Sequence, residues 1–199
     1  SVMVRYGDTN VLCTVTASAK PREGVDFFPL SVDYEEKMYS VGRIPGSFQR
    51  REGRASEKAI LTSRCIDRPI RPLFPKDLRN DCSVVATVMS VDPDCSPEIA
   101  AMIGVSTAIA ISDIPWDGPI SGVNVGLVDG EIVLNPTLEQ RAKTDLNLTV
   151  ASTADLVAMI EAGGNEISDD LMFDCIMAGK EKNKKIVKFI QGIVDEIGK

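Results

Sequence analysis

Basic side chains are concentrated in one short part of an otherwise acidic chain. Residues 43–71 contain eight basic and three acidic residues, whereas the other 170 residues carry 14 basic and 26 acidic ones. Positive charge focused in this way, on a surface that otherwise repels anions, is typical of a binding patch for polyanions. Seven of the eight basic residues are arginines, whose planar guanidinium group matches a phosphate with two parallel hydrogen bonds. The segment therefore predicts a site for a phosphate-rich ligand.

The last three arginines of this segment have helical spacing. Arg64, Arg68 and Arg71 fall at positions i, i+4 and i+7, which places them on one face if the helix continues as far as the proline between them. Three guanidinium groups on one face repel each other unless an anion bridges them. In the alternative interpretation, neighbouring acids pair with the arginines and the face is a structural ion network. Those acids are Glu52, Glu57 and Asp67.

One aromatic residue lies among the arginines, in the stretch GSFQRREGR at residues 46–54. A single loop aromatic usually packs into the core, but Phe48 has no apolar residue directly beside it. The other interpretation is base stacking, because an aromatic ring beside arginines is a common platform for single-stranded nucleic acid.

The chain has no histidine, which excludes several kinds of catalytic site within it. Ser-His-Asp and Cys-His nucleophiles, HExxH zinc sites and imidazole bases all require that residue. The five cysteines are widely spaced and form no CxxC pair, so we expect small buried hydrophobes rather than disulfides or thiolate metal ligands. Among Asp113, Asp117, Asp129 and Asp145, the turn explains Asp129 and loop ends explain the first two, and we expect no metal ligand in this chain.

Length and composition favour one substantial soluble core. The chain has 199 residues, of which 44% are hydrophobic and 26% charged, and neither a membrane-spanning run nor an apolar leader is evident. We therefore expect a cytoplasmic protein without a membrane segment.

The hydrophobic pattern predicts mostly strands in the first part of the chain and helix at its end. The expected strands are residues 11–17, 30–34, 82–91, 123–128, 131–134, 146–151 and 157–161. The expected helices begin after Ser56, near Pro97 and after Ser168. Asp129-Gly130 is a strong hairpin signal, and the nearly continuous apolar run 82–91 suits a strand covered on both faces. The pattern indicates an α+β domain at residues 1–165, followed by an all-α segment at 166–199.

Three stretches carry a close resemblance to a known family. They are GRIPGSFQRREGRASEKAILTSRCIDRPIRPLFP at residues 42–75, MIGVSTAIAISDIPWDGPI at 102–120 and VLNPT at 133–137. Together they resemble the first ribonuclease-PH-like core domain of the bacterial polynucleotide phosphorylase family, over essentially the whole chain. The resemblance implies a mixed β-sheet packed with helices, similar to domain 2 of ribosomal protein S5. It also implies that the family's opening strands are missing before Tyr6, and that residues 166–199 begin the helical segment between two core domains.

The family resemblance implies a function. Such proteins are homotrimeric rings that degrade RNA from its 3′ end with inorganic phosphate, releasing nucleoside diphosphates, and they process and degrade mRNA, in some cases with degradosome-type partners. The residues that this resemblance assigns to RNA binding are Phe48, Gln49, Arg50, Arg51, Arg54, Arg64, Arg68 and Arg71. Gln49 departs from the family pattern, in which two adjacent apolar or aromatic residues are common, so we expect a weaker grip on the strand.

The resemblance also implies that this part of the protein does not catalyse. The family's catalytic serines, aspartates and lysine, together with the Mg²⁺ site, lie in the second core domain. The matching strand here reads Met159-Ile160-Glu161-Ala162 and contains no lysine. We therefore expect a noncatalytic, RNA-channelling and trimer-forming half; a stand-alone RNA-binding or assembly module is the alternative.

Overall fold

The first sheet contains four strands, and one pair of neighbours is parallel. The computed structural model describes residues 1–46 and 48–199; Ser47, in the predicted RNA-binding loop, lies outside the described residues. The strand order is β1 (Val2–Tyr6), β2 (Thr9–Pro21), β4 (Asn80–Ser90) and β3 (Leu30–Glu36). Only the β3–β4 pair is parallel among these. Parallel neighbours need a long crossover, and that crossover holds the predicted loop and helix α1 (Glu57–Ile70).

The second sheet is antiparallel throughout. Its order is β6 (Glu131–Leu134), β5 (Ser121–Val128), β7 (Leu146–Ser152) and β8 (Val157–Gly164). The predicted hairpin is confirmed: Asp129 and Gly130 join β5 to β6 with φ values of 51° and 81°. Both turn residues therefore have the positive φ that a two-residue type I′ hairpin turn requires.

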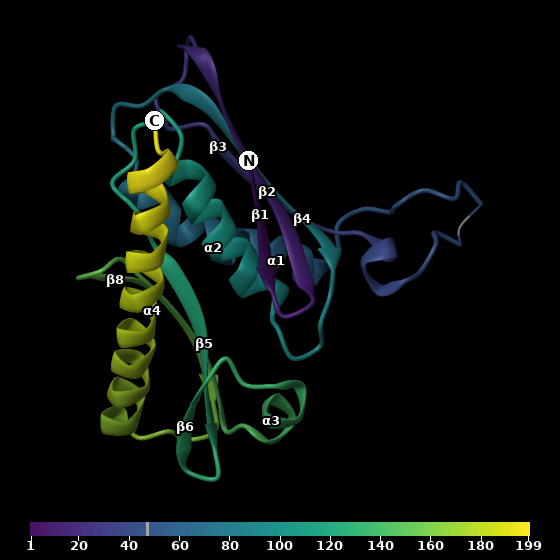
Figure 1. Ribbon diagram of the computed structural model, residues 1–199, viewed down its shortest axis with the longest axis vertical. Helices are drawn as coiled ribbons and strands as arrows, with labels where there is room; N and C mark the ends of the chain where they lie inside the picture. Colours follow the sequence, from purple (N-terminus) through teal and green to yellow (C-terminus); the bar gives the residue numbers. More distant parts are fainter. Residues whose placement is uncertain (47) are drawn as a thin grey trace.

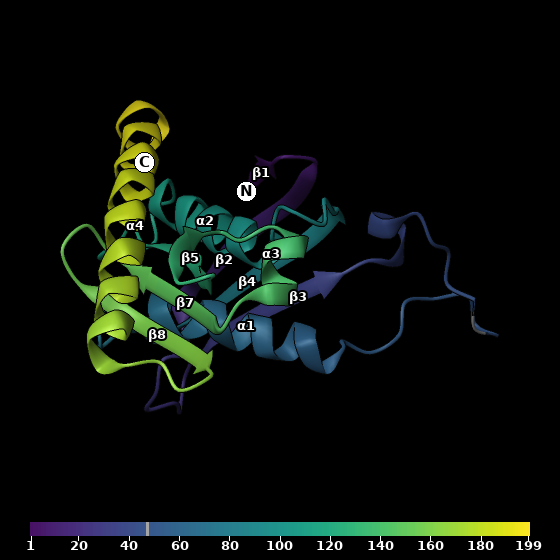
Figure 2. The same cartoon turned by 90° about the horizontal axis from the view of Figure 1, so that it is seen from below.

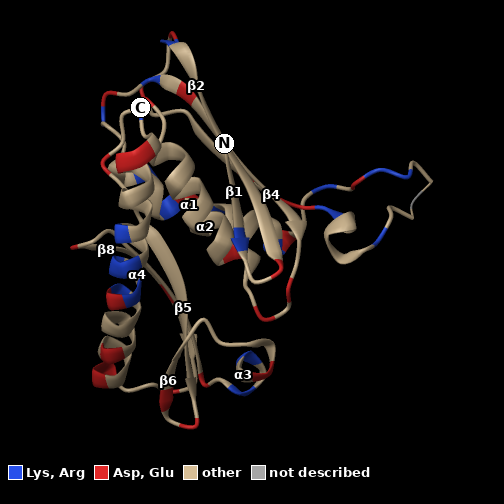
Figure 3. Ribbon diagram, viewed as in Figure 1, with Lys and Arg blue, Asp and Glu red and all other residues tan. Residues whose placement is uncertain are grey.

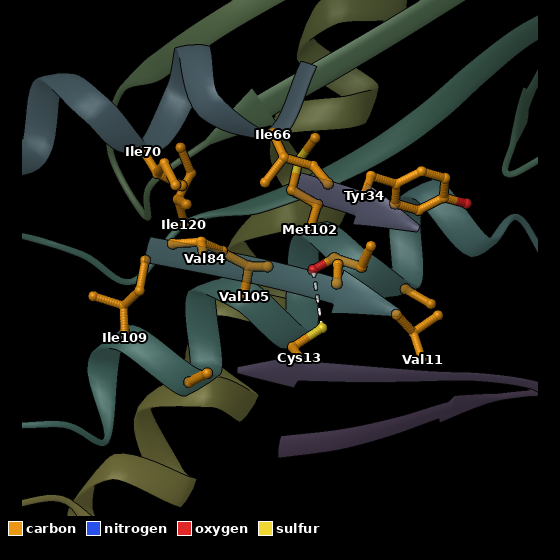
Figure 4. Close-up of a cluster of buried hydrophobic side chains, with 14 of the residues drawn as sticks. Val11, Cys13, Tyr34, Ile66, Ile70, Val84, Met102, Val105, Ile109 and Ile120 are labelled. Atoms are coloured by element: carbon orange, nitrogen blue, oxygen red, sulfur yellow. Dashed lines mark hydrogen bonds between the residues drawn. The ribbon is translucent and has the colours of Figure 1, made fainter. Parts of the chain in front are cut away.

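Helix α2 (Pro97–Ala110) lies between the two sheets and is apolar on all sides for that reason (Figures 1 and 2). Ten of its 14 residues are buried. A Cβ at Gly104 would lie 2.5 Å from the Cys13 Sγ of β2, so only glycine permits this approach. On the other side, the space beside Gly122 of β5 is filled by the thioether of Met102. Figure 4 shows Met102 and Val105 within the resulting core, between β2 and α1.

Helix α4 (Asp169–Ile197) covers the outer face of the second sheet (Figure 2). Cys175 packs in a second cluster with side chains of β5 and β7. Further along, the buried Asn183 amide donates a hydrogen bond of 2.9 Å to the Val150 carbonyl. The helix begins after Ser168, as the sequence predicts, and Ser168 caps it by accepting from the Leu171 amide. The expected boundary at residue 165 stays a prediction, although α4 packs directly on the sheet before it.

The structure corrects several details. Helix α3 (Leu138–Lys143) was not expected, and the 3₁₀ turns η1 (Met38–Val41) and η2 (Arg71–Leu73) were not either. Strand β4 alternates buried and half-buried residues, so the expectation of cover on both faces is wrong: the helices pack on one face only. All five cysteines are unpaired, but only three are buried while two are half-buried. The buried ones are Cys13, Cys82 and Cys175, and the others are Cys65 and Cys95.

Among residues 1–46 and 48–199, no helix has both the length and the apolar character that crossing a bilayer requires.

Candidate functional site

The predicted loop projects far from both sheets (Figure 1, right). It connects the end of β3 to the start of α1, and its described residues from 48 to 56 are all exposed. Phe48 is fully exposed, so the interpretation that it packs into the core is wrong. Ile44, just before the predicted site, is 84% exposed as well. An aromatic ring held in solvent beside arginines is available for stacking against a base.

Hydrogen bonds and two left-handed residues shape the loop and its two ends. Gly42 closes η1 with a φ of 70°, which a residue with a Cβ seldom adopts. The Glu52 carboxylate accepts a 2.9 Å hydrogen bond from the Met38 amide, and this contact ties the returning limb to the base of the loop. Arg50 has a φ of 49°, a left-handed conformation that turns the chain near the loop tip. Ser56 then begins α1 by accepting from the Ala59 amide at 3.0 Å.

The loop arginines are exposed and lack carboxylate partners. In the part of the chain that the structure describes, no ion pair within 4.0 Å involves Arg43, Arg50, Arg51 or Arg54. Glu52, which the alternative interpretation paired with them, contacts a backbone amide instead. Figure 3 shows the basic positions along the outer part of this loop. The ion-network interpretation therefore does not describe the loop.

The arginines of α1 share one face but differ in their surroundings. Arg64 is exposed and forms no ion pair with any described residue. Arg68 lies 3.5 Å from a Glu161 carboxylate oxygen, and both side chains are more than half exposed, so the pair is weak. Helix α1 continues one residue past Pro69, which is how the face reaches Arg71.

Arg71 is engaged by contacts within the chain. Its guanidinium group lies 2.8 Å from an Asp67 carboxylate oxygen and donates to the carbonyls of Phe28 and Leu30 at 3.3 and 3.1 Å. These contacts connect the end of α1 to the start of β3. The ion-network interpretation is thus confirmed for Arg71, and a contact of this residue with RNA stays a prediction.

A cleft of about 1180 Å³ lies beside α1, and residues of both sheets line it. Lys58 and Cys65 of α1, Glu98 at the start of α2 and Glu161 of β8 line it. Lys58 Nζ lies 2.7 Å from Glu98 and 3.8 Å from Glu36. Lys58 therefore pairs with two of the carboxylates that line the cleft.

The protonation states in the cleft follow from these pairs. Burial opposes ionisation of Glu98, but hydrogen bonds from Lys58 and from the Ser96 hydroxyl outweigh it and lower the pKa of this carboxyl. Burial raises the pKa of the Cys65 thiol to about 11, and the charge of Glu161 contributes in the same direction. Cys65 is therefore a neutral thiol at pH 7 and a poor nucleophile.

Two features of this region were missed from the sequence. Thr137 and Gln140 form a capping box at the start of α3, and the TLEQ pattern could have predicted that helix. Arg141 of α3 then reaches the cleft and donates to the Pro93 carbonyl. The pairing of Lys58 with Glu98 joins residues 40 positions apart, and no local pattern signals it.

Comparisons with known proteins agree with this architecture. Residues 1–115 match the model of domain 1 of the 3′ exoribonuclease family, and residues 118–182 match the model of its domain 2. The first match covers β1 to α2, and the second covers the second sheet and the first half of α4.

Curated relatives and a solved structure are also similar to the chain. It is 65% identical over its whole length to polyribonucleotide nucleotidyltransferase of Ruminiclostridium cellulolyticum and 61% identical to that of Clostridioides difficile, and it spans 28% of each. The crystal structure of rice (Oryza sativa) Rrp46 has the same fold, with a TM-score of 0.77, 17% identity, and coverage of 96% of this chain and 86% of that one.

Proposed function

Because this chain belongs to the 3′ exoribonuclease family, we propose that it is the RNA-channelling and trimer-forming part of a phosphorolytic 3′-to-5′ exoribonuclease. The full-length enzyme uses inorganic phosphate to shorten single-stranded RNA, including mRNA, and releases nucleoside diphosphates. A phosphate oxygen bonds to the phosphorus of the terminal phosphodiester, and the bond from that phosphorus to the 3′ oxygen of the shortened RNA breaks. Phosphate is already anionic, so the reaction needs positioning and charge neutralisation more than a histidine base.

The observation that carries this proposal is the exposed loop. Phe48 offers a ring for stacking, while Arg50, Arg51 and Arg54 offer guanidinium groups with no carboxylate partner among the described residues. Single-stranded RNA presents both an aromatic face and a phosphate at every nucleotide, so its chemistry matches this pattern. In a ring of three copies, three such loops would surround the path of one strand.

One observation supports a role without catalysis. Glu36 and Glu98 share Lys58, and Glu161 faces Arg68, so these three cleft carboxylates are engaged by side chains of the same chain. Among residues 1–46 and 48–199, no group of three Asp, Glu, Cys or His side chains is placed to hold a metal ion. We propose that the Mg²⁺ of the full-length enzyme is bound by the second core domain.

The alternative, an assembly module, rests on apolar surface. Leu61 of α1 lines the cleft and is exposed, and Ile60 of α1 and Ile160 of β8 are exposed as well. Such residues suit a contact with another domain or another copy, and a homotrimer in the full-length protein would cover apolar surface of this kind. Degradosome-type partners and a cytoplasmic location belong to the same proposal.

RNA binding by the 199-residue chain tests the proposal. Affinity for a labelled oligoadenylate should fall with salt, with a log–log slope of about −0.7 for each phosphate contacted. Arg50→Ala together with Arg51→Ala should flatten this slope by about one unit or more. Arg5→Ala with Arg22→Ala removes equal charge at two exposed positions outside the loop, and this control should leave the slope unchanged. An unchanged slope in the loop variant would contradict the proposal.

A phosphorolysis assay tests the noncatalytic assignment separately. The chain alone, with Mg²⁺ and inorganic phosphate, should release no nucleoside diphosphate from oligoadenylate. Robust release would show that catalytic groups lie within residues 1–199.

A further inference from the structure

Helix α4 carries a second concentration of positive charge, far along the chain from the arginine loop. Five lysines lie within nine residues, with only Glu181 among them to oppose their charge. They are Lys180, Lys182, Lys184, Lys185 and Lys188. Acidic residues occupy both ends of the same helix instead, as Figure 3 shows. The charge of the helix is therefore segregated along its length.

The packing of α4 leaves these lysines on the outer surface. The helix buries Cys175, Gly179, Asn183 and Val187, which follow each other at intervals of four residues along one side. Lys182, Lys184, Lys185 and Lys188 are exposed, and Lys180 is half-buried at the margin of the packed side. Lys182 and Lys185, three residues apart, share one exposed side, whereas Lys180, Lys184 and Lys188 form a row at positions i, i+4 and i+8 on another.

The lysines lack carboxylate partners. In the part of the chain that the structure describes, none of them lies within 4.0 Å of an Asp or Glu oxygen. Like charges three or four residues apart on one side of a helix destabilise it. An anion lying against them offsets this repulsion, and a polyanion with regularly spaced charges does so best.

An exposed aromatic side chain accompanies the lysines. Phe189 is 66% exposed and follows Lys185 by four residues and Lys182 by seven, so it lies on their side of the helix. A large apolar ring in solvent beside basic groups repeats the combination found at Phe48 and its arginines. An acidic protein segment would match the lysines, but single-stranded RNA matches the ring as well.

We propose that Lys182, Lys185 and Phe189, which share one exposed side of α4, form a second contact site for single-stranded RNA, separate from the loop. This inference rests on the proposed RNA-related function of the chain. Both views place α4 on the opposite side of the molecule from the loop (Figures 1 and 2). The α4 site therefore holds a segment of RNA outside the path that passes the loop, and the two sites together add avidity for long RNA.

Binding of labelled oligoadenylate to the 199-residue chain tests the site. The double variant Lys182→Gln, Lys185→Gln should flatten the log–log salt slope by about one unit or more, since two phosphate contacts are lost. The control Lys20→Gln, Lys76→Gln removes the same charge at exposed positions away from α4 and should leave the slope unchanged. Phe189→Ala should weaken binding about 5-fold or more at one salt concentration and leave the slope intact. Circular dichroism melts verify that each variant is folded.

The outcomes separate this proposal from the proposed function. A double α4 variant with the affinity and slope of the unmodified chain, while the Arg50/Arg51 variant loses both, overturns the α4 site and leaves the loop assignment standing. The reverse result supports α4 and contradicts the loop. Competition by polyglutamate distinguishes the partner: if it displaces α4-bound RNA as effectively as unlabelled oligoadenylate at equal charge concentration, the surface recognises acidic polymers in general and the RNA proposal is overturned.

Discussion

The arginine loop and the cleft beside α1 are neighbours in the fold, yet their charges are arranged in opposite ways. In the loop, Arg50 and Arg51 extend into solvent with no carboxylate partner among the described residues. In the cleft, Lys58 is 2.7 Å from Glu98, and both groups also face other polar side chains. Charges that are paired within the chain stabilise its fold, whereas unpaired charges are available to a ligand. The difference distinguishes the binding surface from the structural one.

Replacing Arg71 should have the largest effect on stability, because its guanidinium group is paired within the chain. Arg71→Ala removes an ion pair with Asp67 and two hydrogen bonds to carbonyls near the start of β3. We expect the free energy of unfolding to fall by about 2 kcal/mol, measured by urea denaturation. The matched Arg51→Ala variant should change it by less than about 0.5 kcal/mol. Equal effects of the two variants would remove the distinction between the two regions.

Phe48 should affect binding without affecting stability. Phe48→Ala removes a fully exposed ring, so the melting temperature should stay the same. Affinity for oligoadenylate should fall about 5-fold or more, the equivalent of one stacked base. Phe27→Ala is the control, since Phe27 is also exposed but lies in another loop. A loss of affinity shared by both variants would show that the effect is not specific to the arginine loop.

The Lys58–Glu98 pair should make stability depend on pH. The folded-state pKa of Glu98 is below its ordinary value of 4.5, so the pair contributes above that pH and its contribution is lost as pH falls through the folded-state pKa. Glu98→Gln should lower the free energy of unfolding at pH 7 by about 1 kcal/mol. The difference from the unmodified chain should shrink below pH 4.5 in denaturant titrations. A difference that stays constant with pH would show that Glu98 is not held ionised by its partners.

Arg68 should give the smallest effect on stability. Its pair with Glu161 is more than half exposed on both sides, so Arg68→Ala should change the free energy of unfolding by less than about 0.5 kcal/mol. The same variant should flatten the salt slope of RNA binding by about 0.7, as the loss of one phosphate contact requires. A large loss of stability would place Arg68 with Arg71 among the structural arginines.

The sequence predicts local features of this protein well. Ser56 caps a helix and another helix begins after Ser168, both as expected, and Asp129-Gly130 forms the expected turn, because each feature depends on residues only a few positions apart. The short helix α3 also had a local signal, the capping box at Thr137, which the periodicity of apolar residues does not reveal.

Features that depend on distant residues could not be predicted in this way. The spacing of Arg64, Arg68 and Arg71 gives one helical face, but only the packing of α1 against β3 brings the carbonyls of Phe28 and Leu30 to Arg71. The division into two sheets, with α2 between them, likewise depends on contacts of Gly104 and Gly122 across the core. The sequence therefore locates the candidate binding residues, and the structure separates those that are available from those that are engaged.

Photo-crosslinking tests the central claim most directly, namely that the exposed loop holds single-stranded RNA. The 199-residue chain would be irradiated with a 4-thiouridine-substituted oligonucleotide, digested, and its crosslinked peptides identified by mass spectrometry. We expect crosslinks on the peptide that contains Phe48 and their loss when Arg50 and Arg51 are both replaced by Ala. Efficient crosslinking only to peptides outside the loop would contradict the account.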